Sequence, residues 1–277
     1  MVDRKKKMRL DLLMVEKGVV ASREKAKVLI MAGEVMVNGE TVTKPSKQFP
    51  TDVKIHLKER LKYVSRGGYK IEGAFENFKL SVKGKVVCDL GSSTGGFVDF
   101  LIKNGAKRVY AVDVGKGQLH WKLRNDSRVI VKEGINARYL KVDDLGEKVD
   151  FLTCDLSFIS VKKVLNVVYD VLKDDGKALI LIKPQFEALR SEVKKGVVRD
   201  ERVHIRVLKE VKEEAKKKGF GVKGFTFSKL RGPKGNIEFF ILLEKGAAEG
   251  FTDDFTDIEN VVKEAWNFFK NDEGRKC

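Results

Sequence analysis

The spacing of apolar and polar positions predicts an alternation of strands and helices from residue 85 onward. Short apolar runs predict strands near 86–90, 108–113, 128–131, 149–155 and 177–183. Between them, apolar residues recur every three or four positions, which predicts helices near 95–104, 116–124, 160–173 and 199–218. This alternation indicates an α/β fold with a mostly parallel sheet covered by helices on both faces.

The end of this region has a different pattern. Two apolar runs, 222–228 and 236–243, are separated only by the short stretch 229–235. Because no helix lies between them, they predict two antiparallel strands that end the sheet. Residues 247–277 place several acids before an apolar run with helical spacing, which predicts a C-terminal helical extension.

The first part of the chain predicts a small α+β domain over residues 8–58. Ser22 is placed to cap a helix over 23–32, and Asn38-Gly39 between alternating apolar residues predicts a hairpin. Residues 1–7 form a basic arm before this domain. The polar, glycine-containing stretch 59–70 is the expected linker, so the large domain is predicted to cover residues 71–246.

Composition narrows the class of partner and the cellular compartment. The chain has 277 residues, with 56 Lys and Arg against 40 Asp and Glu, a net charge of +16. Such an excess favours binding to a phosphate backbone, although a lysine-rich solvated surface is the alternative. Cys88, Cys154 and Cys277 form no C-x-x-C pair, which indicates reduced thiols, a cytoplasmic protein and no metal site. No apolar run is long enough for a membrane span.

Residues 85–97 predict a strand, a glycine-rich turn and a helix start, which is how a doubly wound sheet opens a nucleotide site. Asp113 ends the next predicted strand, where a carboxylate can take ribose hydroxyls. No Gly-Lys-Ser/Thr follows the turn, so a P-loop is excluded. The candidate cofactor contacts are Asp89, Gly91, Ser92, Ser93, Thr94, Gly95, Gly96, Phe97 and Asp113. NAD and S-adenosyl-L-methionine both suit this turn.

Charged residues also occur at the ends of predicted apolar strands. Asp155 and Lys183 each close such a strand, and Glu238 is expected inside the last strand. Sites in open α/β sheets form at the carboxyl ends of the strands, so Asp155 and Lys183 should lie near each other. Lys70 can supply a partner for Glu238. The set is either a structural ion-pair network or a lysine base acting on a weakly acidic hydroxyl.

The N-terminal domain resembles the S4 RNA-binding domain. The residues that carry this resemblance are Arg9-Leu10-Asp11, Ser22-Arg23, Ala26, Leu29-Ile30, Gly33, Val35, Val37-Asn38-Gly39 and Lys44-Pro45-Ser46. In that fold the second helix presents its cations to RNA, chiefly to phosphates. The RNA-binding residues that follow from the resemblance, together with one from the stretch before Lys70, are Arg9, Arg23, Lys25, Lys27 and Arg66. A structural module with solvated cations is the alternative.

The large domain resembles a Rossmann-like S-adenosylmethionine-dependent methyltransferase, since sheets of that class end in an antiparallel pair. Lys70, Asp155, Lys183 and Glu238 match the Lys-Asp-Lys-Glu set of the FtsJ-type RNA ribose 2′-O-methyltransferases. The whole chain is similar to the TlyA family of ribosomal RNA 2′-O-methyltransferases, often labelled hemolysin A. The runs that carry this similarity are Val64-Ser65-Arg66-Gly67-Gly68-Tyr69-Lys70, Gly91-Ser92-Ser93-Thr94-Gly95-Gly96-Phe97, Asp113-Val114-Gly115-Lys116-Gly117-Gln118-Leu119, Asn136-Ala137-Arg138, Asp155-Leu156-Ser157-Phe158-Ile159-Ser160 and Lys183-Pro184-Gln185-Phe186-Glu187. The family more often has an aromatic residue at Lys116.

The resemblance implies methyl transfer from S-adenosyl-L-methionine to a cytidine 2′-hydroxyl of 23S ribosomal RNA, and some members also modify 16S RNA. It implies that Lys183 is the base, that Asp155 holds Lys183 and the hydroxyl, and that Lys70 and Glu238 position the ribose. Asn136 and Asp155 join the cofactor contacts. Ribosomal RNA or ribosomal subunits are the expected partners, and a monomer or weak homodimer is the expected state.

The same residues also bear on several other functions. Methylation of an exocyclic amine usually needs prolines after Asp155, and carbon-5 methylation needs a nucleophilic cysteine, whereas Cys154 should face away from the site. Pseudouridine synthases also carry S4 units but lack the cofactor turn. A non-catalytic RNA-binding ribosome assembly factor and a membrane-active hemolysin stay open as alternatives. The sequence does not identify the methylated nucleotide.

Overall fold

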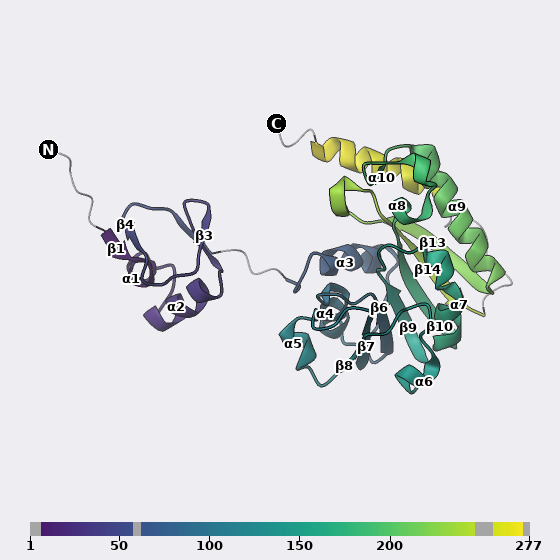
Figure 1. Ribbon diagram of the computed structural model, residues 1–277, viewed down its shortest axis with the longest axis horizontal. Helices are drawn as coiled ribbons and strands as arrows, with labels where there is room; N and C mark the ends of the chain where they lie inside the picture. Colours follow the sequence, from purple (N-terminus) through teal and green to yellow (C-terminus); the bar gives the residue numbers. More distant parts are fainter. Residues whose placement is uncertain (1–6, 58–61, 247–256, 274–277) are drawn as a thin grey trace. The chain divides into compact units, whose positions relative to one another are not determined.

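The computed structural model describes residues 7–57, 62–246 and 257–273 (Figure 1). The chain divides into two compact units, Met1–Lys62 and Tyr63–Cys277. We call them the N-terminal unit and the C-terminal unit and describe each by itself.

The N-terminal unit packs two short helices against small antiparallel sheets. A three-stranded sheet has the order β3-β2-β5, and β1 pairs with β4. The elements are β1 (Lys7–Arg9), α1 (Leu10–Glu16), α2 (Arg23–Met31), β2 (Val35–Val37), β3 (Glu40–Val42), β4 (Gln48–Pro50) and β5 (Ile55–Leu57). The Ser22 hydroxyl accepts a hydrogen bond from Lys25 N at 3.2 Å, which confirms the predicted helix cap. Asn38 and Gly39 both have positive φ, as a two-residue turn of a right-twisted hairpin requires, and this confirms the hairpin.

The C-terminal unit is built on a seven-stranded sheet with the order β13-β14-β10-β9-β6-β7-β8. Its strands are β6 (Val86–Leu90), β7 (Arg108–Asp113), β8 (Val129–Glu133), β9 (Val149–Cys154), β10 (Leu172–Ile182), β13 (Phe220–Phe227) and β14 (Phe239–Lys245). The five neighbouring strands β10, β9, β6, β7 and β8 are parallel to one another. Strand β14 lies antiparallel between β10 and β13. The predicted parallel sheet and its antiparallel end are therefore confirmed.

Helices cover both faces of this sheet (Figure 1). They are α3 (Gly67–Asn77), α4 (Gly96–Lys103), α5 (Trp121–Arg124), α6 (Val142–Leu145), α7 (Leu165–Val171), α8 (Pro184–Glu187), α9 (Glu201–Lys217) and α10 (Ile258–Glu273), and a small hairpin joins β11 (Val193–Lys194) to β12 (Val197–Val198). Successive strand residues face opposite layers: Val87 belongs to the core cluster that includes α3 and α4, whereas Cys88 belongs to the cluster that includes α7, α9 and α10. The near-continuous apolar strands of the sequence follow from this burial on both faces.

The boundaries of some elements differ from the sequence prediction. The helix predicted over 116–124 covers only Trp121–Arg124, because Gly115 and Gly117 precede it and Gly117 has a φ of 71°. Helix α3 begins at Gly67, inside the stretch suggested as a linker, and Tyr63 is already buried against Tyr69 and Phe100. Glu238 lies just before β14 rather than inside it.

The C-terminal helix α10 packs against α9 and β13. Its buried face consists of Ile258, Val262, Ala265 and Phe269. Trp266 Nε1 donates a hydrogen bond to Nδ1 of the buried His204 on α9, at 3.1 Å. None of the helices in the described part of the chain has the length and apolarity that crossing a bilayer requires.

We expect the stability of the C-terminal unit to fall below about pH 6.5, where His204 binds a proton in the unfolded chain but not in the folded one. Burial lowers the pKa of His204 to about 4, so between about pH 6.5 and 4 the unfolded chain binds a proton that the folded chain does not. Between pH 7 and 5 this linkage removes about 2 kcal/mol from the free energy of unfolding. Urea unfolding at both pH values should show this loss in the wild type and not in His204→Gln. An equal loss in both proteins would contradict the prediction.

Candidate active site

The glycine-rich turn between β6 and α4 lies at the level where three parallel strands end. In the register of the sheet, Leu90 pairs with both Val112 and Cys154. The residues that follow these three, Gly91, Asp113 and Asp155, therefore share one edge of the sheet. The sequence prediction of a site at the carboxyl ends of the strands agrees with this register.

Two glycines allow the turn to pack closely against its neighbours. Gly91 has a φ of 83°, and a Cβ atom there would lie 2.5 Å from the backbone oxygen of Asp155. Gly95 has a φ of 94°, and a Cβ atom there would lie 2.3 Å from Leu123 Cδ1. Any other residue would both strain the backbone and push these segments apart.

Asp113 fixes the outer side of the turn. Its Oδ2 accepts a hydrogen bond from Ser93 N at 2.8 Å, and its Oδ1 accepts one from Gly115 N at 2.7 Å. Each carboxylate oxygen keeps a second lone pair that a ligand hydroxyl can use. Asp113 is thus held rigidly at the place where the sequence predicted contact with a ribose.

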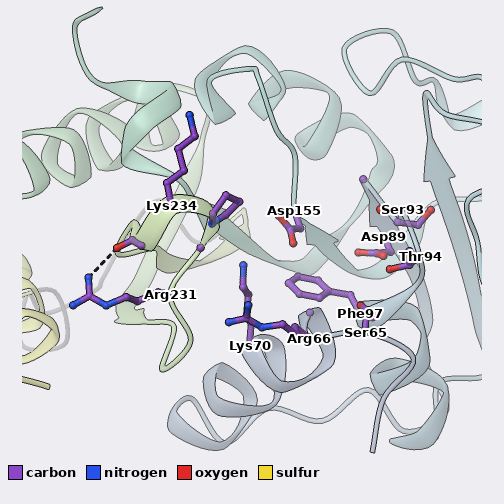
Figure 2. Close-up of a pocket in the computed structure, with 17 residues that line it drawn as sticks. Ser65, Arg66, Lys70, Asp89, Ser93, Thr94, Phe97, Asp155, Arg231 and Lys234 are labelled. Atoms are coloured by element: carbon purple, nitrogen blue, oxygen red, sulfur yellow. Dashed lines mark hydrogen bonds between the residues drawn. The ribbon is translucent and has the colours of Figure 1, made fainter. Parts of the chain in front are cut away.

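Two hollows meet at the turn. The first, of about 680 Å³, lies between the turn, the start of α3 and residues 231–235 (Figure 2). The second, of about 770 Å³, lies between the turn, Asn136 and residues 155–160. Gly91, Ser93 and Asp155 line both hollows. The predicted cofactor residues in the first hollow are Asp89, Gly91, Ser92, Ser93, Thr94, Gly96, Phe97 and Asp155; Asp113 and Asn136 line the second, and buried Gly95 lines neither.

The environment of the Asp89 carboxylate shows whether this cleft suits S-adenosyl-L-methionine. Its side chain is 1% exposed, and Oδ1 accepts a hydrogen bond from Thr153 Oγ1 at 2.6 Å. Its Oδ2 has no hydrogen-bond partner among the described residues. Burial raises the pKa of Asp89 to about 7. A ligand amine at this carboxylate would satisfy the free oxygen, and Asp113 would take ribose hydroxyls, so the residues present suit the cofactor.

The four predicted catalytic residues come together as two ion pairs. Lys183 Nζ lies 2.6 Å from Asp155 Oδ1 and donates a hydrogen bond to Ser157 Oγ at 2.9 Å. Lys70 Nζ lies 2.6 Å from Glu238 Oε2. Lys70 and Asp155 line the first hollow (Figure 2), whereas their partners Lys183 and Glu238 are buried and do not line it. The role of each residue stays a prediction.

The sheet register explains why these pairs are neighbours. Ile182, the last residue of β10, pairs with Phe239, the first residue of β14. Because the two strands are antiparallel, the next residue after β10, Lys183, lies beside the residue before β14, Glu238. On its other side, β10 runs parallel to β9, which ends just before Asp155. Lys183 is therefore flanked by a carboxylate on each side.

Two supporting contacts of the site were not predicted from the sequence. Glu187 accepts hydrogen bonds from Ser160 Oγ and Val161 N, both at 2.6 Å, and so ties the segment after Lys183 to the loop after Asp155. At Gly232, a Cβ atom would lie 2.0 Å from Glu238 Oε1, so only glycine lets the 229–235 connection pack on this carboxylate. The signal for the second contact is Gly232-Pro233-Lys234-Gly235, a sequence that by itself predicts only a turn between two strands.

Cys154 faces the hydrophobic core on the α7 side of the sheet, with no exposed surface. Burial raises the pKa of this thiol, which disfavours the thiolate that nucleophilic attack requires. The geometry therefore agrees with the argument against carbon-5 methylation.

The predicted RNA-binding residues fall into distinct settings. Arg9 and Arg23 both donate hydrogen bonds to the buried carboxylate of Asp11 at about 2.9 Å, so they also hold the N-terminal unit together. The hydrogen bond from Arg9 and then that from Arg23 lower the pKa of Asp11 to about 2. Lys25 is exposed and Lys27 half-buried on α2. Arg66 is exposed in the C-terminal unit, where it lines the first hollow.

Comparison with known proteins identifies relatives of both units. The family model described as FtsJ-like methyltransferase matches residues 63–245, and the S4 domain model matches residues 8–52. The chain is 46% identical to a Bacillus subtilis protein provisionally named rRNA methyltransferase YqxC, over 96% of both chains. It is 39% identical to the Mycobacterium tuberculosis protein named 16S/23S rRNA (cytidine-2′-O)-methyltransferase TlyA, over 86% of this chain and 90% of that one. A solved structure from Streptococcus thermophilus, provisionally named a hemolysin, is 44% identical and has a TM-score of 0.75, covering 98% of this chain and 99% of that chain.

We expect Gly91→Ala to weaken binding of S-adenosyl-L-methionine by tenfold or more, because the added methyl group meets the Asp155 carbonyl and shifts the turn. Isothermal titration calorimetry measures the change. Gly84→Ala is the matched control, since Gly84 also has a positive φ but nothing within 4 Å of its Cβ position. Equal affinities in the two variants would show that the turn does not determine cofactor binding.

Proposed function

The chain belongs to the TlyA family of FtsJ-like methyltransferases and is an S-adenosyl-L-methionine-dependent enzyme, and from this premise we propose that it methylates the 2′-hydroxyl of a cytidine ribose in ribosomal RNA. The observation that carries the proposal is the pairing of Lys183 with Asp155 and of Lys70 with Glu238 around one cleft. The proposed substrate is 23S RNA, with 16S RNA as a second substrate to be tested beside it. With this substrate we also propose a cytoplasmic location.

S-adenosyl-L-methionine, when bound, supplies a methyl group on a sulfonium that an oxygen nucleophile displaces in line. Asp89 would hold its amino group, and Asp113 and Asn136 would hold its nucleoside part. The glycine-rich turn and the loop after Asp155 would enclose it, because the turn lines both hollows and the loop lines the second. Alignment by these rigid segments supplies much of the rate acceleration in such a displacement.

Lys183 is the proposed proton acceptor for the ribose hydroxyl. In its neutral form the Lys183 amine takes the hydroxyl proton as the new oxygen–carbon bond forms and the carbon–sulfur bond breaks. Asp155 and Ser157 fix the position of Nζ through contacts of 2.6 and 2.9 Å. Lys70, held by Glu238 and facing the first hollow, is proposed to orient the ribose.

The exposed cations of α2 are proposed to guide the RNA. Arg23 is held by Asp11, whereas Lys25 and Lys27 follow it on the same helix without the same anchor. Contacts from such lysines go to phosphates, so they add affinity without reading the base sequence. The base and its neighbours must then be selected elsewhere on the protein.

We predict that Lys183→Met lowers the rate of methyl transfer to ribosomal RNA at least 100-fold, which is the lower range for loss of a general base. Lys245→Met is the matched control. Both lysines are 7% exposed, but Lys245 donates a hydrogen bond to Leu172 O and lies 3.5 Å from Asp174, away from the cleft. Single-turnover transfer of labelled methyl groups to unmethylated transcripts of 23S and 16S RNA measures the rate.

In the same experiment, cofactor and RNA affinities of Lys183→Met should stay within about threefold of the wild type. Full activity in this variant would refute the role of Lys183. If the wild type transfers no methyl group to either transcript, the non-catalytic assembly factor becomes the better hypothesis. Mapping 2′-O-methylation in cells with and without the gene identifies the nucleotide.

Replacing Lys25 and Lys27 together by alanine should weaken binding to ribosomal RNA and make the affinity less dependent on salt. For two lost phosphate contacts, the slope of log affinity against log salt should fall by about 1.4 for single-stranded RNA. Filter binding over a salt series measures both quantities. The control is Lys44→Ala with Lys54→Ala, which removes the same charge elsewhere in the N-terminal unit. An effect of equal size in the control would refute the assignment to α2.

A further inference from the structure

We propose, on the basis of the RNA substrate proposed above, that a nucleotide next to the methylated ribose binds in a third hollow beside the active site. This flanking hollow has a volume of about 570 Å³. Three segments of the chain contribute cationic and aromatic side chains to its lining: Arg199, Arg231, Lys234, Trp266, Phe269 and Lys270. Helix α10 forms one of its walls.

The flanking hollow adjoins the first hollow. Arg231, Lys234 and Gly235 line both of them. Figure 2 shows the glycine-rich turn on one side of the first hollow, Arg231 and Lys234 on the other, and Lys70 and Asp155 between them. A cofactor at the turn and a ribose at Lys70 and Asp155 would leave the Arg231 side for the rest of the RNA strand.

The chemistry of the flanking hollow suits a nucleotide. Four cationic side chains line it, from Arg199, Arg231, Lys234 and Lys270, and no acidic residue does so within the described part of the chain. The Arg231 guanidinium lies 4.5 Å from the centre of the Phe269 ring, and its Nη1 donates a hydrogen bond to Gly235 O at 2.8 Å. This contact holds the guanidinium plane in place, so a base can stack near it while the other cations take a phosphate.

The position of α10 makes the site specific to chains that carry this helix. The FtsJ-like family model ends at residue 245, whereas Trp266, Phe269 and Lys270 lie on α10. Trp266 is anchored on His204, so the aromatic wall is rigid. An acidic peptide would also meet the four cations, but the residues shared with the hollow proposed for the ribose favour RNA.

The test uses the full-length enzyme and unmethylated 23S RNA transcribed in vitro. Arg199→Ala with Lys270→Ala should lower the affinity for this transcript about tenfold, with cofactor affinity unchanged. Both side chains are exposed, so the fold is not at risk. The control, Lys216→Ala with Lys217→Ala, removes two exposed charges from α9 and should bind as the wild type does. Equal RNA affinity for the first double variant and the wild type would overturn the proposal.

Lysine acetylation of the wild type, with and without the transcript, locates the contact directly. Lys234 and Lys270 should be protected by RNA, and Lys217 should not. If the wild type methylates the transcript while Lys270 stays fully reactive, the flanking site is wrong and the proposed function stands. If Lys270 is protected but no methyl group is transferred, the proposed activity is wrong and the flanking site stands.

Discussion

Charges buried at the ends of adjacent strands must be paired, and this need constrains the strand order of the C-terminal unit. Lys183 and Glu238 are almost completely buried, and an unpaired charge in such a place is strongly destabilising. The register of β9, β10 and β14 supplies the partners, because it puts carboxylates on both sides of Lys183. A parallel sheet without the inserted strand β14 would leave Lys70 without Glu238. The strand order that identifies the fold is therefore also the order that assembles the site.

The segments around these pairs limit how far they can move. Glu187 joins the segment after Lys183 to the loop after Asp155 by two hydrogen bonds of 2.6 Å. Gly91 and Gly232 let backbone approach Asp155 and Glu238 more closely than any side chain would allow. Catalysis of an in-line displacement depends on alignment, so rigidity at these positions contributes to function as well as to stability.

The sequence predicted the sheet well because its strands are apolar on both faces and bounded by glycines. It placed Asp155 and Lys183 correctly, since a charge that closes a buried strand has only the sheet edge to occupy. It could not place the start of α3, because Gly67 and Gly68 are poor helix formers and tertiary packing under Tyr63 holds them there. The sequence identified residues 229–235 as a connection between two antiparallel strands but did not predict their contact with Glu238. The place of this connection beside Glu238 depends on a contact across the fold that local patterns do not contain.

Two carboxylate oxygens buried at the cleft lack a hydrogen-bond partner within the part of the chain that the structure describes, which lowers the stability of the fold. Asp89 Oδ2 and Glu238 Oε1 are buried and have no hydrogen-bond partner among the described residues. Each such atom costs about 1–3 kcal/mol in a closed interior. A protein keeps such a cost where a ligand removes it, and Asp89 faces the hollow proposed for the cofactor. Glu238 instead contacts Lys70 through Oε2 at 2.6 Å, and the connection at Gly232 packs against its Oε1, so this carboxylate is held in place. The two acids therefore act differently, because Asp89 can accept a ligand whereas Glu238 fixes the position of Lys70.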